Sequence, residues 1–280
     1  MKPAQATFKG VADANIFYQV WQPDGPARAV IMIAHGVAEH SGRYQQLAEY
    51  FAEHGYVVAA VDHEGHGKSD GTPGFIERFD NYAQTLDLLR TRLQADYPEL
   101  PFILLGHSMG GLIAAYYLLE AQSKFAMCVL SGPAIKSDVE PPGWQAVIIR
   151  WLARWLPKLG VLKLDTNAIS RDPEVVAAYK KDPLVYDGKL SARQVVEMFD
   201  AMHTVERDAH KISLPLLLLH GSEDRLTAPA GSQFLYDNVS STEKSLKFYP
   251  GLYHEIFNEP ERLEVFKDVL SWCDSQLGRL

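Results

Sequence analysis

Short apolar runs alternate with longer amphipathic segments along most of this 280-residue chain. The runs have the length of buried strands, and the segments between them have the spacing of helices. Such an alternation predicts a mostly parallel sheet with helices on both faces. We expect core strands at 29–34, 56–62, 101–105, 126–131, 214–219 and 245–249, and helices at 44–54, 79–96 and 111–119.

Two parts of the chain depart from this alternation. Near the N-terminus, residues 7–9 and 16–21 predict an antiparallel hairpin at the edge of the sheet. Between them and the C-terminus, residues 136–212 show helical patterns and turns but no clear strand. Because core strands then resume, we expect this segment to be a helical cap inserted into a core formed by 1–135 and 213–280.

The most specific motif is the sequence GHSMG, from Gly106 to Gly110, which fits the pattern G-x-S-x-G. It lies between an apolar run and a buried helix, the strand–turn–helix context of a nucleophile elbow. We expect glycine at both ends because the two arms of the turn approach closely. Ser108 would point outward at a helix N-terminus, where free N–H groups and the helix dipole favour an oxyanion. Ser108 is therefore the candidate nucleophile.

A nucleophilic serine needs a base, and the base needs a carboxylate that orients it. In chains with this elbow they follow in the order serine, acid, histidine. The loop after the strand at 214–219 contains Glu223 and Asp224, either of which could be the acid. His254 lies in the loop between the last strand and the last helix. Three placements that agree in order and context favour a triad over a chance motif.

The developing oxyanion needs two backbone donors. One is expected from the N–H of Met109, the residue after the nucleophile, and the other from the loop after an early strand. That loop follows the strand at 29–34, and Gly36 lets its backbone turn tightly. The N–H of Val37 is therefore the second candidate.

Five segments of the chain resemble, in order, those of monoacylglycerol lipases. They are HGVAEHSGRY at 35–44, DHEGHGKSDG at 62–71, GHSMGG at 106–111, GSEDRL at 221–226 and YH at 253–254. The resemblance implies an α/β-hydrolase fold, an acyl-enzyme mechanism that releases fatty acid and glycerol, and no cofactor. It implies that Ser108, Asp224 and His254 are the triad and that Val37 and Met109 supply the oxyanion donors.

The same resemblance implies where the glycerol end of the substrate lies. It places Glu39, Arg43 and Tyr179 near that end. Some members carry a second histidine three residues after the catalytic one, near the exit for glycerol. Here Phe257 occupies that position, so this polar contact is lost.

Other activities are compatible with these motifs. A lysophospholipase or a general carboxylesterase shares the fold and the triad. A proline-type aminopeptidase would also need an acidic group in the cap, for which Asp172, Glu174 and Glu197 are candidates. A non-catalytic ligand receptor on the same fold is disfavoured by the intact triad. Epoxide hydrolases and dehalogenases are disfavoured because they carry aspartate at the elbow.

One helical segment of the predicted cap has an apolar face. Arg150, Arg154 and Lys158 fall four residues apart on another face, and Pro157 and Gly160 end the helix. The apolar face could pack on the core, as most apolar stripes do, or contact membranes peripherally to collect a single-chain lipid ester. Its members are Trp144, Val147, Ile148, Trp151, Leu152 and Trp155.

Charge and sequence composition limit the kinds of partner and the cellular compartment that we expect. The net charge of −8 argues against a nucleic-acid partner. The N-terminus lacks the apolar region of a signal peptide, and no run of about 18 apolar residues predicts a membrane span, so we expect a cytoplasmic protein. Cys128 and Cys273 are expected to be buried thiols. His63, His66 and His107 lack an accompanying carboxylate pair or cysteine, so we expect structural roles and no metal site.

Overall fold

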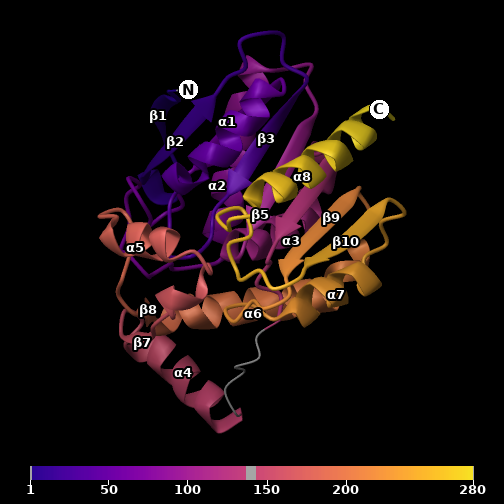
Figure 1. Cartoon of the computed structure of the whole chain (residues 1–280). Helices are drawn as coiled ribbons and strands as arrows, with labels where there is room; N and C mark the ends of the chain where they lie inside the picture. Colours follow the sequence, from indigo (N-terminus) through magenta and orange to yellow (C-terminus); the bar gives the residue numbers. More distant parts are fainter. Residues whose placement is uncertain (1, 137–142, 280) are drawn as a thin grey trace.

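The computed structural model describes residues 2–136 and 143–279. Within these residues the central sheet has eight strands in the order β1-β2-β4-β3-β5-β6-β9-β10 (Figure 1). The six strands β4, β3, β5, β6, β9 and β10 pair in parallel. Strands β1 and β2 form the predicted antiparallel hairpin at the edge, and β2 also pairs antiparallel with β4. The strands are β1 (Ala4–Lys9), β2 (Asn15–Trp21), β3 (Ala29–Ala34), β4 (Tyr56–Val61), β5 (Phe102–His107), β6 (Met127–Ser131), β9 (Leu216–Gly221) and β10 (Lys244–Tyr249).

Helices cover both faces of this sheet, which confirms the predicted fold class. Side chains alternate between the faces along each strand. On β3, for example, Val30 packs toward α2 and α3, whereas Ile31 packs toward α1 and α8. Strands enclosed on both faces are continuously apolar, which explains why the core strands are visible in the sequence. The helices are α1 (Gln45–Glu53), α2 (Asp80–Asp96), α3 (Met109–Ala121) and α8 (Arg262–Leu277).

The segment between β6 and β9 adds further elements outside the central sheet. Its helices are α4 (Gly143–Trp155), α5 (Pro173–Lys181) and α6 (Ala192–Asp208). It also contains β7 (Gly160–Leu162) and β8 (Leu190–Ser191), which pair as a separate antiparallel sheet. The prediction of no strand in this segment was therefore wrong. Strands this short cannot display the alternation of period two that identifies a strand.

Four smaller features complete the description of the fold. Helix α4 ends at Trp155, before Pro157, as predicted. Helix α7 (Pro229–Asn238), which begins with a proline suited to a first helical turn, was not predicted. Cys128 and Cys273 are buried, as predicted. In the described parts of the chain, no helix is long and apolar enough to cross a membrane.

Candidate active site

Ser108 occupies a strained turn between β5 and α3. Its φ of 56° and ψ of −122° lie in a region that residues with a side chain rarely adopt. Such a conformation persists only where the surroundings hold it. The Ser108 carbonyl accepts the N–H groups of Gly111, Leu112 and Ala134 at 2.9, 3.1 and 3.1 Å, and its own N–H donates to Ser131 at 3.0 Å. Hydrogen bonds to both the C=O and the N–H of Ser108 therefore hold the turn in this conformation.

Both glycines of the elbow lie where a side chain would not fit, as predicted. A Cβ on Gly106 would overlap the carbonyl of Gly110, across the turn. A Cβ on Gly110 would overlap the carbonyls of Ala34 and His35, at the end of β3. The obstacle at Gly110 is therefore the neighbouring strand rather than the other arm of the turn.

The structure brings His254 to Asp224, not to Glu223. His254 Nδ1 lies 2.6 Å from Asp224 Oδ2, and the side chain of Glu223 is exposed. Asp224 Oδ1 accepts the N–H groups of Leu226 and Thr227 at 2.8 and 3.0 Å. Burial opposes ionisation of Asp224, but His254 and these donors outweigh it and hold its pKa far below the ordinary value.

Two further side chains, which no motif singled out, hold the Asp224 carboxylate. His220 Nε2 lies 3.1 Å from Oδ2, and His220 Nδ1 lies 2.7 Å from the hydroxyl of Ser232. The Thr227 hydroxyl lies 2.9 Å from the same Oδ2. The available signal was a polar residue, His220, within the apolar run of β9. A carboxylate held by this many donors cannot rotate away from His254.

The His254 imidazole is buried against a second imidazole. Burial lowers its pKa, but the negative charge of Asp224 outweighs burial and raises the pKa above 6.5. The His107 ring packs 4.6 Å from the His254 ring, and its Nδ1 lies 3.0 Å from the Ser131 carbonyl. Burial, followed by the neighbouring His254, lowers the pKa of His107 to about 4. His107 is therefore neutral at pH 7 and supports the ring of His254.

The two candidate oxyanion donors are Val37, in the loop after β3, and Met109, the first residue of α3. Within the described residues, neither the Val37 nor the Met109 N–H has a protein acceptor. A Cβ on Gly36 would lie 3.1 Å from Ser108 Cβ and 2.8 Å from a Glu39 carboxylate oxygen. This close approach explains the glycine. The predicted reason, a tight turn at Gly36, was wrong, because the positive φ of this loop (67°) belongs to Ala38.

The imidazole of His35 orients the peptide that carries the Val37 N–H. His35 Nε2 accepts the N–H of His63 at 2.9 Å, which places the remaining proton on Nδ1. That Nδ1 lies 2.7 Å from the Gly36 carbonyl. In a trans peptide the C=O and N–H point in opposite directions, so this hydrogen bond directs the Val37 N–H away from His35.

The other buried histidines stack together rather than surround a site. The rings of His63 and His66 lie 4.4 and 5.2 Å from that of His35. Burial lowers the pKa of His66 to about 4 and that of His63 well below 6.5. In the part of the chain that the structure describes, no group of three or more His, Cys, Asp or Glu residues could hold a metal ion.

The three residues expected near glycerol lie together. The Arg43 guanidinium lies 4.5 Å above the Tyr179 ring and 2.9 Å from a Glu39 carboxylate oxygen. Glu39 and Tyr179 line the pocket at Ser108, whereas Arg43 lines a smaller neighbouring cavity. Phe257 is buried and lines this smaller cavity as well.

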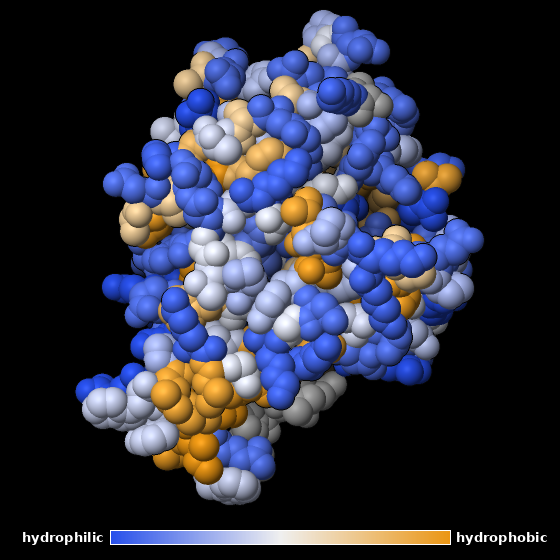
Figure 2. Space-filling model, turned by 90° about the vertical axis from the view of Figure 1, so that its left-hand side faces the viewer, coloured by the Kyte–Doolittle hydropathy of each residue, from blue (hydrophilic) through white to orange (hydrophobic). Residues whose placement is uncertain are grey.

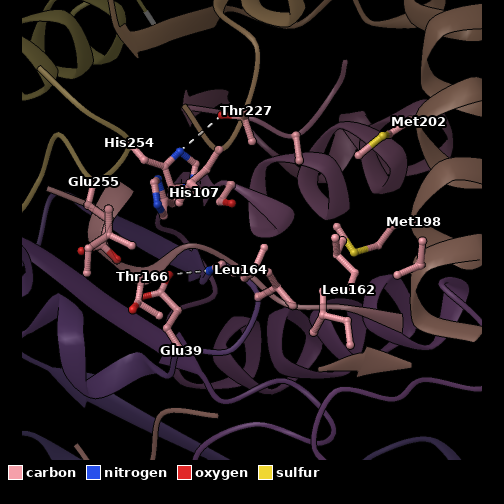
Figure 3. Close-up of a pocket in the computed structure, with 18 of the residues that line it drawn as sticks. Glu39, His107, Leu162, Leu164, Thr166, Met198, Met202, Thr227, His254 and Glu255 are labelled. Atoms are coloured by element: carbon pink, nitrogen blue, oxygen red, sulfur yellow. Dashed lines mark hydrogen bonds between the residues drawn. The ribbon is translucent and has the colours of Figure 1, made fainter. Parts of the chain in front are cut away.

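The pocket at Ser108 has a polar end and an apolar end. In Figure 3, Glu39, His254 and Glu255 lie on one side, and Leu162 and Met198 lie on the other. Its volume is about 120 Å³. The apolar lining comes mainly from the segment between β6 and β9, and it comprises Leu162, Leu164, Ile169, Leu190, Val195, Met198, Phe199 and Met202.

Comparison with known proteins shows the family to which the chain belongs. The family model described as serine aminopeptidase, S33, matches residues 25–261. The chain is 42% identical to the monoacylglycerol lipase of Mycolicibacterium smegmatis, over 98% of both chains. The chain belongs to the monoacylglycerol lipase family. Human monoglyceride lipase is 35% identical, over 93% of this chain and 87% of its own.

A solved structure from this family shares the whole fold. The monoacylglycerol lipase of Paleococcus ferrophilus is 31% identical and superposes with a TM-score of 0.83. The match covers 99% of this chain and 100% of that one. Family membership, which the five motifs predicted, is therefore confirmed along nearly the entire chain.

Proposed function

We propose that this protein is a serine hydrolase that cleaves monoacylglycerols to a fatty acid and glycerol. One observation carries the proposal: Ser108, Val37 and His254, which is paired with Asp224, line a pocket with an apolar end, and among the described residues the N–H groups of Val37 and Met109 have no protein acceptor. Full-length similarity to monoacylglycerol lipases supports the substrate class. An apolar cavity beside an acyl-transfer centre suits an ester of a fatty acid.

The mechanism assigns a role to each group. His254 removes the Ser108 proton while Ser108 Oγ attacks the ester carbonyl, and Asp224 stabilises the imidazolium that forms. The N–H groups of Val37 and Met109 stabilise the tetrahedral oxyanion, each by about 3 kcal/mol. The intermediate collapses, and glycerol leaves with the proton from His254. Water, deprotonated by His254, then attacks the acyl-enzyme, which releases the fatty acid and restores Ser108.

The two ends of the pocket orient the substrate. The acyl chain occupies the apolar end, where Met198, Phe199 and Met202 of α6 form the wall. The glycerol occupies the polar end, where Glu39 and Tyr179 offer hydrogen-bonding groups. Arg43 holds these two side chains from behind, so its contribution to glycerol binding is indirect.

The family description raises the question of aminopeptidase activity. An aminopeptidase needs an unpaired acidic group in the pocket for the substrate amine. Asp172 instead caps α5 by accepting the N–H of Glu174 at 2.8 Å, and Glu197 accepts the N–H of Phe79 at 2.8 Å. Among the described residues, none of Asp172, Glu174 and Glu197 lines the pocket. Ester hydrolysis is therefore the favoured activity.

A substrate panel tests this proposal. It should contain monoacylglycerols, diacylglycerols, lysophospholipids, p-nitrophenyl esters and a prolyl amide. We expect monoacylglycerols to give the highest kcat/KM and the prolyl amide to give no measurable turnover. A higher kcat/KM for lysophospholipids would reassign the protein to that class, and turnover of the prolyl amide would restore the aminopeptidase assignment.

The pH profile should report the proposed base. Neutral His254 is the active form, and Asp224 raises the pKa of His254 above 6.5. Because the protonated form accumulates below that pKa, kcat/KM should fall as the pH drops, with a midpoint above pH 6.5. Hydrolysis of a soluble ester, followed by pH-stat titration, measures this midpoint. A midpoint well below pH 6.5 would contradict the assignment of His254.

We also propose that the segment between β6 and β9, expected at 136–212, is a cap that contacts lipid surfaces. Helix α4 projects at the lower end of the molecule (Figure 1), where Figure 2 shows an apolar patch. Trp144, Trp151 and Trp155 are 66%, 57% and 62% exposed, which argues against the alternative that this face packs on the core. Leu162, in β7 shortly after α4, is both exposed and part of the pocket lining.

The charges beside this patch favour an anionic lipid surface. Arg154 and Lys158 are exposed, and within the described residues neither forms an ion pair. The Arg154 guanidinium lies 5.7 Å from the Trp155 ring. Tryptophan beside cations is typical of helices that settle at the boundary between headgroups and acyl chains. Arg150 does not contribute, because it pairs with Asp200 at 2.5 Å.

The double variant Trp151→Ser/Trp155→Ser tests this contact. We expect weaker binding to vesicles that contain an anionic lipid and slower hydrolysis of long-chain monoacylglycerol in those vesicles. Hydrolysis of a soluble short-chain ester and the melting temperature should stay close to wild type, because both tryptophans are exposed. Leu88→Ser, at an exposed apolar position on α2, is the matched control. Unchanged vesicle binding, or equal losses on both substrates, would refute the proposed contact.

A further inference from the structure

A buried charged bridge joins the loop of His254 to the loop of the proposed oxyanion donor. Its centre is Arg43, in the 3-10 turn η2 (Ser41–Tyr44). Arg43 Nη1 and Nη2 lie 2.5 and 2.7 Å from the two carboxylate oxygens of Glu255, the residue after His254. The same Nη1 lies 2.9 Å from Glu39 Oε2. The Arg43 and Glu255 side chains are only 10% and 5% exposed, so water screens this pair weakly.

Both glutamates of the bridge form further hydrogen bonds to segments around the reacting groups. Glu39 Oε1 accepts the N–H of Gly36 at 2.6 Å and the hydroxyl of Tyr44 at 2.7 Å. The N–H of Glu255 donates to the carbonyl of Ile169, in the segment between β6 and β9, at 2.8 Å. The bridge therefore connects the oxyanion loop, the histidine loop and the proposed cap.

We propose that Arg43 and Glu255 are positioning residues that set the distance between the His254 imidazole and the oxyanion loop. The inference rests on the proposed function, because it concerns the same centre. A two-pronged contact between guanidinium and carboxylate fixes both distance and orientation. The base and the oxyanion donors act on one tetrahedral intermediate, and a misplacement of about 1 Å can cost about 100-fold in rate.

The surroundings of Arg43 separate this role from direct contact with glycerol. The ring of Tyr179 covers the Arg43 guanidinium. The Nη atoms of Arg43 donate hydrogen bonds to Glu39 and Glu255. Of the described residues that line the pocket at Ser108, Glu39 and Glu255 are the members of this bridge that reach it, and Arg43 is not among them. A residue that touched glycerol would affect only substrates that contain glycerol, whereas a positioning residue affects every ester.

Glu255 also influences the charge state of His254. After burial, which lowers it, the pKa of His254 is raised by Asp224, then by Glu255 and Glu39. His107, which stacks on the same ring, is neutral at pH 7 because its pKa is about 4. Removing the charge at position 255 should therefore lower the pKa of His254, an effect that lost packing alone would not produce.

The experiment compares Glu255→Gln with wild type on a monoacylglycerol and on p-nitrophenyl butyrate. We expect kcat to fall about 10- to 100-fold on both esters, because the base and the oxyanion loop lose their fixed separation. KM should change little, and the acid limb of kcat/KM should move to lower pH. Glu261→Gln is the matched control, because Glu261 pairs with Arg171 at the surface and its side chain is 43% exposed.

The outcomes are distinguishable. A loss confined to the monoacylglycerol, through a higher KM, would show that the bridge binds glycerol and would overturn the proposal, as would unchanged kcat on both esters. If Glu255→Gln does not fold, Glu255→Asp is the substitute, because it keeps the charge but shortens the side chain. It should lower kcat without moving the acid limb of kcat/KM. A kcat of Glu255→Asp equal to that of wild type would overturn the proposal. Failure of the proposed function would appear separately, as a wild-type protein that cleaves neither ester.

Discussion

Ser108→Ala is expected to abolish ester hydrolysis while the protein stays folded. The substitution removes the only atom of Ser108 that the proposed mechanism uses, the side-chain oxygen. Loss of the nucleophile of a serine hydrolase lowers kcat by about 10⁶-fold, as in subtilisin. Stability should change little, because the substitution leaves the backbone hydrogen bonds that hold the Ser108 turn in place. The strained φ of 56° is about equally unfavourable for alanine and for serine, so it does not change the free energy of unfolding.

Three measurements on one preparation check this result. They are hydrolysis of a monoacylglycerol, covalent labelling by a fluorophosphonate and the thermal unfolding midpoint. Ser271→Ala, at an exposed position of α8, is the matched control and should behave as wild type. Substantial turnover by a folded Ser108→Ala variant would refute the triad assignment. Absence of labelling in the wild type would instead favour a non-catalytic receptor.

Asp224→Asn is expected to lower kcat by about 10⁴-fold, the loss found for the equivalent change in trypsin. Asparagine has the shape of aspartate, but its amide cannot accept from His254 Nδ1, His220 and Thr227 at once without presenting N–H groups to donors. The imidazole would then adopt the wrong tautomer for accepting the Ser108 proton. Because Asp224 is the main cause of the raised pKa of His254, the acid limb of residual activity should also move to lower pH.

Glu223→Gln is the matched control for this prediction. Glu223 is adjacent in sequence, but its side chain is exposed, and its backbone N–H donates to Leu252 at 3.0 Å whichever side chain it carries. We expect its kcat to stay within about twofold of wild type, as is usual for surface substitutions. Steady-state kinetics of the two variants decide the matter, and reversed results would identify Glu223 as the acid.

The sequence alone determined the parts of this protein that depend on local patterns. The central strands were predictable because burial on both faces makes them continuous apolar runs, as in the strand at 29–34. The elbow was predictable because neither Gly106 nor Gly110 has room for a side chain, although at Gly110 the obstacle is the end of β3 rather than the turn itself. The family was predictable because its motifs occur in a set order. Each of these signals is carried by short segments of consecutive residues.

Only the tertiary structure decided how distant residues meet. Two adjacent acids look equivalent in sequence, and the loop geometry after β9 sends Asp224 inward and leaves Glu223 exposed. The bridge from Arg43 to Glu255 joins residues 212 positions apart, so no local pattern reveals it. An apolar helix face also has the same sequence pattern whether it is buried or exposed. Burial is a property of what packs against a side chain, and only the fold shows that the tryptophans of α4 remain exposed.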